Sequence, residues 1–98
     1  MNYANLLTED RRLVLLRLLA ESEGYSANEY LLATALPGFG HHASHDRVRT
    51  DLDWLAEQDL VRVERPGEVY VATLTGRGAD VAAGRARVAG VKRPLPGE

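Results

Sequence analysis

The sequence predicts an α+β domain of three helices, a two-stranded hairpin and a C-terminal helix. Two observations lead to this fold class. Apolar residues recur at helical spacing over residues 44–58, and that pattern stops abruptly. Residues 60–74 then hold two β-favouring runs on either side of a Pro66-Gly67 turn, which is typical of paired antiparallel strands.

The first helix is expected over about residues 11–22. Thr8 is a suitable N-cap, and Glu9 and Asp10 would favour the amino-terminal end of the helix dipole. Apolar side chains occupy nearly its whole circumference, and a helix of that kind is buried on more than one side. We therefore expect one side to pack on the protein's own core and another to face a second chain.

The second helix is expected over residues 27–36. Ser26 and Glu29 have the spacing of a capping box, and Pro37 with Gly38 cannot continue the helix. The residues expected to point inward are Tyr30, Leu31 and Leu36.

The third helix, 44–58, is expected to start at the N-cap Ser44, and Asp59 lies where helices often end in a left-handed conformation. After the hairpin, Thr75 can cap a last helix over about residues 76–89. The basic, proline-rich residues 90–98 are expected to form a flexible tail, so that the domain covers residues 1–89.

Three segments resemble winged-helix regulators of the ArsR and MarR type. They read RLVLLRLLA (12–20), RVRTDLDWLAEQDLV (47–61) and YVATLTGRG (70–78). The resemblance implies a winged helix-turn-helix fold. Residues 44–58 would then be the recognition helix, and residues 60–74 would be the wing.

The whole chain is also similar to a family of small proteins of Mu-like phages and prophages. Besides the 47–61 segment, the shared features are the Asn2-Tyr3-Ala4 start, LTEDRR (7–12) and GVKRP (90–94). This resemblance implies the winged-helix fold and a phage origin. It implies no particular activity, because a fold does not determine function.

A recognition helix places its amino-terminal side chains in the major groove of DNA. If residues 44–58 are such a helix, they would bind double-stranded DNA and the chain would be a transcriptional regulator. The residues expected to contact DNA are His45, Arg47, Arg49, Thr50 and Asp53 of the helix, with Arg62 and Arg65 of the wing on phosphates.

The charge pattern keeps a different function open. Residues 44–54 hold two arginines and three aspartates, and phosphates repel carboxylates. Residues 1–74 as a whole hold 7 basic and 12 acidic side chains, whereas residues 75–98 hold 5 and 2. The alternative is a winged-helix module that binds another phage protein, in assembly or DNA packaging, without specific DNA binding.

We also expect a homodimer, because the first helix has more apolar surface than one core needs. The last helix is rich in small residues and would supply the other half of a two-fold interface. The residues expected at this interface are Leu13, Leu16, Ala79, Ala82 and Ala83.

Other classes of function find little support in the sequence. His41, His42 and His45 are the one cluster that hints at a metal, but two of them lie in a loop and there is no cysteine, so we expect no metal site. The chain has no nucleophile elbow or phosphate-binding loop, so we expect neither enzymatic activity nor a cofactor. Without a signal peptide or an apolar run long enough for a membrane, the expected location is the cytoplasm of a bacterial host.

Overall fold

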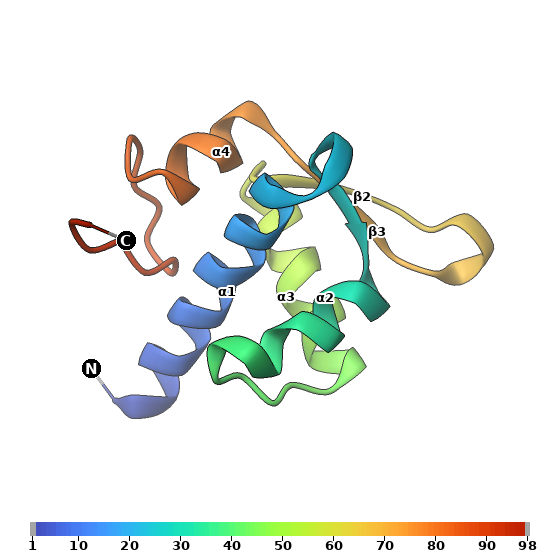
Figure 1. Cartoon of the computed structure of the whole chain (residues 1–98), viewed down its shortest axis with the longest axis horizontal. Coiled ribbons are helices and arrows are strands. Elements are labelled where there is room, and N and C mark those ends of the chain that lie inside the picture. Colours follow the sequence, from blue (N-terminus) through green and yellow to red (C-terminus); the bar gives the residue numbers. More distant parts are fainter. Residues whose placement is uncertain (1, 98) are drawn as a thin grey trace.

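The computed structural model describes residues 2–97 as a mixed α+β domain (Figure 1). The helices are α1 (Tyr3–Glu21), α2 (Glu29–Ala35), α3 (His45–Glu57) and α4 (Gly76–Ala82), and the strands are β1 (Ser26–Asn28), β2 (Val61–Glu64) and β3 (Val71–Leu74). The strands form an antiparallel sheet in the order β1-β3-β2.

α1 starts earlier than expected. Its N-cap is Asn2, whose side chain accepts a hydrogen bond from the Asn5 backbone N–H at 2.8 Å. The expected cap, Thr8, lies inside the helix. The helix ends at Glu21, close to the expected stop, and Gly24 turns the chain with φ +66°.

The strand β1 is an element that the sequence did not predict. It pairs with β3, and the Thr73 hydroxyl donates to the Ser26 hydroxyl across the pair at 3.1 Å. The expected capping box at Ser26 is therefore wrong, and α2 is capped instead by Asn28, which accepts from the Leu31 N–H. Leu36 is buried as expected, but Leu32 is the other buried side chain here, whereas Tyr30 and Leu31, which were also expected to point inward, are exposed.

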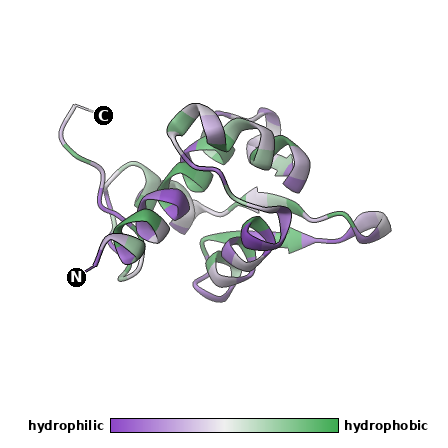
Figure 2. Cartoon of the chain, turned by 90° about the horizontal axis from the view of Figure 1, so that it is seen from below, coloured by the Kyte–Doolittle hydropathy of each residue, from purple (hydrophilic) through white to green (hydrophobic). Residues whose placement is uncertain are grey.

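The helix and hairpin that follow agree with the sequence prediction. Ser44 caps α3 by accepting from the Arg47 N–H, and Asp59 ends the turn with φ +61°. β2 and β3 pair from Val61–Leu74 to Glu64–Val71. The tip of the hairpin projects beyond the helices in two perpendicular views (Figures 1 and 2).

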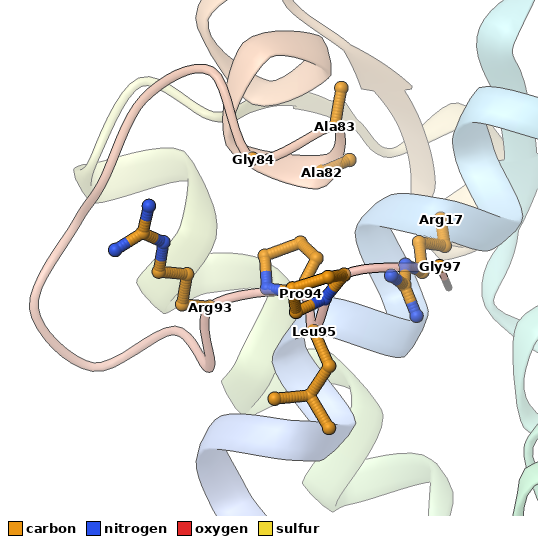
Figure 3. Close-up of a pocket in the computed structure, with 9 residues that line it drawn as sticks. Arg17, Ala82, Ala83, Gly84, Arg93, Pro94, Leu95 and Gly97 are labelled. Carbon is orange, nitrogen blue, oxygen red and sulfur yellow. The ribbon is translucent and has the colours of Figure 1, made fainter.

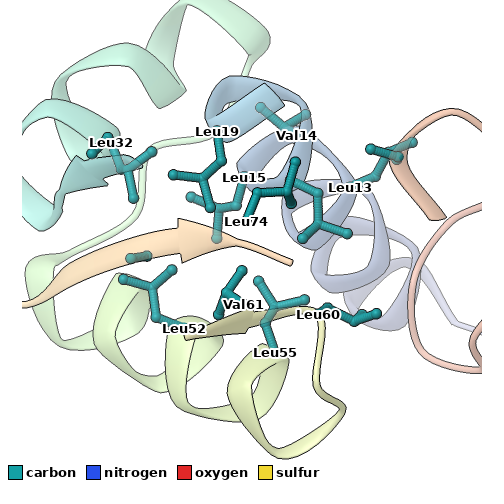
Figure 4. Close-up of a cluster of buried hydrophobic side chains, with 14 of the residues drawn as sticks. Leu13, Val14, Leu15, Leu19, Leu32, Leu52, Leu55, Leu60, Val61 and Leu74 are labelled. Carbon is teal, nitrogen blue, oxygen red and sulfur yellow. The ribbon is translucent and has the colours of Figure 1, made fainter. Parts of the chain in front are cut away.

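The core lies between α1, α3 and the sheet (Figure 4). Leu13 and Leu16, expected at a dimer interface, are completely enclosed by the chain itself, as are Leu15 and Leu19. The reason is that β1, β3 and the Leu36–Phe39 turn pack on α1, as do α4 and the C-terminal segment. Over residues 13–19, the apolar side chains of α1 are therefore buried or half-buried within one chain.

The last helix is shorter than expected, because the chain leaves the helical conformation after Ala82 and Gly84 has φ +81°. The following segment packs back on α1. Val91 is buried, and the Lys92 N–H donates to the Glu9 carbonyl at 3.1 Å. The packed domain thus continues past residue 89, where the tail was expected to begin. No helix within residues 2–97 has the length and apolar character needed to cross a membrane.

Candidate functional site

The outward face of α3 is the surface on which the DNA hypothesis depends. Residues 46, 50, 53 and 57 fall on one side of the helix by their spacing of three or four, and they include the exposed Asp46, Thr50 and Glu57. Asp53 is half-buried on the same side. This side therefore carries three carboxylates and no arginine.

The half-buried Arg49 is bound by a carboxylate from α2. Its Nε and Nη2 donate to the two carboxylate oxygens of Glu29 at 2.8 and 2.9 Å, and Nη2 also donates to the Glu68 carbonyl at 3.0 Å. Glu29 is only 1% exposed, and it accepts a third hydrogen bond from the Tyr70 N–H at 2.7 Å. One carboxylate thus ties α2, α3 and the hairpin together.

The hydrogen bonds from Arg49 lower the pKa of Glu29, and the Tyr70 N–H acts in the same direction. Burial opposes both effects without overcoming them. The same pair raises the pKa of Arg49. Glu29 is therefore ionised at neutral pH, and the charge of Arg49 is compensated inside the protein.

A second set of contacts joins the hairpin to α3. The Tyr70 hydroxyl donates to the Asp53 carboxylate at 3.1 Å. The guanidinium of Arg65 lies 4.8 Å from the centre of the Tyr70 ring, and its Nη2 is 4.0 Å from the Asp53 carboxylate. Asp53 and Arg65 were both predicted to contact DNA. They instead lie against each other and against Tyr70.

The other predicted contacts fall into two groups. His45 lies against the Tyr30 ring at 4.8 Å, and the Thr50 hydroxyl donates to the Asp46 carbonyl in its own helix. Arg47 and Arg62 are exposed, and neither side chain makes a hydrogen bond or ion pair within residues 2–97. Among the arginines predicted to contact DNA, only these two are uncommitted, in the sense that their side chains have no hydrogen-bond or ion-pair partner within residues 2–97.

Sequence reasoning did not find the two buried carboxylates. Glu29 was assigned to a capping box, and Asp51 accepts hydrogen bonds from Arg11 Nε and Nη2 on α1. Arg12 Nε lies 3.9 Å from the same Asp51 carboxylate. An acidic residue on the inward side of an amphipathic helix, as Asp51 is by its spacing from Val48 and Leu55, was the available signal.

The three histidines of the predicted cluster lie in different surroundings. His41 is buried, and its Nε2 lies 2.7 Å from the Asp10 carboxylate, whereas His42 is exposed and His45 faces Tyr30. In the described part of the chain, no three His, Asp or Glu residues are grouped closely enough to hold a metal ion.

The alanines expected at a dimer interface lie beside the protein's own C-terminal segment. Ala82 is buried and Ala83 exposed, and both line a hollow of about 640 Å³ that Arg93 and Pro94 also border (Figure 3). Ala79 is half-buried on the same helix. This hollow is formed within one chain.

Comparison with known proteins connects the chain to Mu-like phages. It is 59% identical over 92 residues to a protein of Escherichia phage Mu named uncharacterized protein gp26, and the match covers 94% of this chain and 95% of that protein. The chain belongs to the phage Mu gp26 family. An uncharacterized protein of Haemophilus influenzae is 47% identical over 78 residues, which are 79% of this chain and 76% of that protein.

No family model and no solved structure matches the chain. The names of the two relatives state no activity, so membership of the gp26 family supplies the phage setting and not a function. The properties available for inferring a function of this gp26-family protein are the acidic face of α3, the internally bound Arg49 and the two uncommitted arginines.

Proposed function

We propose that this gp26-family protein is a winged-helix domain that acts by binding another protein. The order of the elements supports the winged-helix assignment. A helix, a short strand and two helices precede a hairpin, and the short strand pairs with the second hairpin strand. In this assignment α3 corresponds to the recognition helix and β2–β3 to the wing.

The observation that carries the proposal is the bidentate ion pair between Glu29 and Arg49. Sequence-specific DNA readers need free donors on the recognition helix, and arginine is the commonest of them. Here Arg49 binds Glu29 and the Glu68 carbonyl, while the exposed Asp46 and Glu57 lie on the outward face of α3 with the half-buried Asp53. That face favours a protein surface over a phosphate backbone.

Titration of labelled duplex DNA at about 50 mM salt tests the proposal, because non-specific DNA binding is strongest at low salt. We expect no binding at about 1–100 μM protein, the range in which non-specific DNA binders associate with duplexes. Salt-sensitive binding that Arg47→Ala weakens would overturn the proposal. Pairwise co-purification with the other proteins of the phage that carries the chain should instead identify a stable partner.

A charge-reversed variant tests whether the carboxylates of the α3 face are the reason for the expected absence of DNA binding. Asp46→Lys with Glu57→Lys should give the α3 face salt-sensitive affinity for DNA, because it replaces repulsion with attraction. The matched control is Glu21→Lys with Glu23→Lys, which changes net charge equally at the exposed end of α1. An equal gain in both variants would mean that net charge, and not the α3 face, governs DNA binding.

A second candidate is the DNA-binding regulator. It is favoured by Arg47 at the amino-terminal end of α3 and Arg62 on β2, which are both exposed and uncommitted. Two such cations could contact phosphates on either side of a groove. The DNA titration above separates this candidate from the first.

A further inference from the structure

Besides the outward face of α3, a second surface lies near the amino terminus of this helix. There the amino-terminal half of α1 meets the loop that precedes α3. An open cleft of about 440 Å³ separates them. Its lining includes Leu7 and Arg11 from α1, His42 and Ser44 from the loop, and Arg47 from α3.

The cleft is lined by basic side chains whose donor groups the protein does not fully use. Arg47 and His42 are exposed and form no ion pair in the described chain. Arg11 is 9% exposed; its Nε and Nη2 bind Asp51, and its Nη1 makes no hydrogen bond within residues 2–97. Two of the nearby carboxylates are already paired, Asp51 with Arg11 and Asp10 with both His41 and Lys92.

An apolar shelf adjoins the cleft at Leu7. Tyr3 and Leu6, in the first two turns of α1, are 73% and 48% exposed, and with Leu7 they follow the spacing of one helix face. Leu7 lines both the cleft and a neighbouring hollow of about 350 Å³ that Tyr3 and Leu6 border. This end of α1 projects at the lower left of Figure 1, away from the sheet.

We propose that the cleft and the shelf together bind an acidic segment of a partner protein. Carboxylates of the segment would lie against Arg47, His42 and the free Nη1 of Arg11, because guanidinium groups bind carboxylates through paired hydrogen bonds. Apolar side chains next to those carboxylates would cover Tyr3 and Leu6. The inference rests on the proposed function and names the chemistry of its partner.

An acidic segment fits this surface better than a duplex does. The uncommitted cations are few and lie within one cleft, whereas DNA needs cations spread along a backbone. Asp46 stands beside Arg47 on α3, and Glu9 borders the shelf. A duplex that extends past the cleft would meet repulsion from both carboxylates, whereas a short acidic segment can place its carboxylates between them. A duplex also keeps its base faces stacked inside the double helix, so it would leave the exposed Tyr3 and Leu6 uncovered.

Fluorescence anisotropy with a labelled peptide of six glutamates followed by two leucines tests the inference on the full chain. We expect saturable binding, and no binding of the matching peptide of six lysines and two leucines. Arg47→Glu should weaken binding about fivefold or more, since it turns an attraction into a repulsion. Its control, Arg62→Glu, makes the same charge change on the exposed face of β2 and should leave the affinity unchanged.

The shelf has its own pair of variants. Tyr3→Ser with Leu6→Ser should weaken the glutamate-leucine peptide about tenfold, the loss expected when two partly covered apolar side chains are removed. Tyr25→Ser with Leu31→Ser removes the same two types of side chain at other exposed positions, 60% and 62% exposed, and should have no effect. Equal losses in both pairs, or equal affinity for the lysine peptide, would overturn the inference.

Two further outcomes separate this inference from the proposed function. Suppose that a co-purified phage partner binds the Arg47→Glu variant as tightly as the wild type. This result would agree with the proposed function but would contradict the inference that the cleft binds an acidic segment. A labelled duplex that displaces the glutamate peptide and is lost with Arg47→Glu would assign the cleft to nucleic acid and overturn both.

Discussion

At the scale of single residues, Glu29 determines how α3 can be used. Its buried carboxylate holds Arg49 and the Tyr70 N–H, so the most central arginine of the expected DNA-binding surface orients the hairpin instead. The sequence could not predict this pairing. Ser26 and Glu29 have the spacing of a capping box, and Arg49 is 20 residues further along the chain.

Replacing Glu29 with glutamine should destabilise the protein by about 2 kcal/mol at neutral pH. The neutral amide cannot form the ion pair. Its NH2 group would also face the N–H groups of Arg49 and Tyr70, which are themselves donors. Urea unfolding measures the loss. Glu64→Gln on the exposed side of β2 is the control and should change the free energy of unfolding by less than about 0.5 kcal/mol.

The same variant has a defined pH signature. Because Arg49 lowers the folded-state pKa of Glu29, the contribution of this carboxylate is complete above the pKa of an unfolded glutamate, about 4. It is lost as the pH falls through the lower folded value. As the pH falls below about 5, the wild type should therefore lose stability more steeply than Glu29→Gln. Parallel curves would contradict the assigned role of Glu29.

At the scale of elements, prediction succeeded where the determining contacts are local. The amphipathic pattern and Ser44 predicted α3, and Pro66-Gly67 predicted the hairpin, because caps and turns act within a few residues. β1 was missed because it has only three residues and exists by pairing with β3. Because β1 was not predicted, the start of α2 was also predicted too early.

The docking of α4 can be tested with two neighbouring glycines. A Cβ at Gly78 would lie 2.0 Å from the Leu60 carbonyl oxygen and 2.8 Å from Leu74 Cδ1, whereas one at Gly76 would meet nothing within 4 Å. Gly78→Ala should cost about 3 kcal/mol, because α4 would have to move off the sheet. Gly76→Ala in the same helix should be neutral or stabilise by up to about 1 kcal/mol. Similar unfolding midpoints for the two variants would mean that α4 is not packed in this way.

At the scale of the whole molecule, the C-terminal segment closes the domain. The Arg12 guanidinium lies 3.8 Å from the centre of the Trp54 ring and donates to the Gly90 carbonyl at 2.9 Å. α1, α3 and the C-terminal segment thus meet at one point. Of the residues that the sequence assigned to a second chain, Leu13, Leu16 and Ala82 are buried within the domain, whereas Ala83 is exposed.

Gly90→Ala tests that closure. Gly90 has φ +98°, and a Cβ there would lie 2.7 Å from Trp54 Cζ2. Gly97 also has a positive φ, +87°, with nothing within 4 Å of a Cβ, so it is the matched control. Gly90→Ala should cost about 2 kcal/mol more than Gly97→Ala in thermal unfolding, because only the first variant adds a collision to the backbone strain. Equal costs would place the segment outside the packed domain, as a flexible tail.

The sequence by itself determined the mixed α+β class, the extent of α3 and the hairpin, and the similarity to Mu-like phage proteins. Each of these depends on local patterns or on whole-chain similarity. Only the tertiary structure decided that Arg49 is bound to Glu29, that Asp51 is bound to Arg11 and that Leu13 is inside the core. Ion pairing and burial depend on which distant segments meet. Arg11 and Asp51 are 40 residues apart, and no local pattern specifies such a meeting.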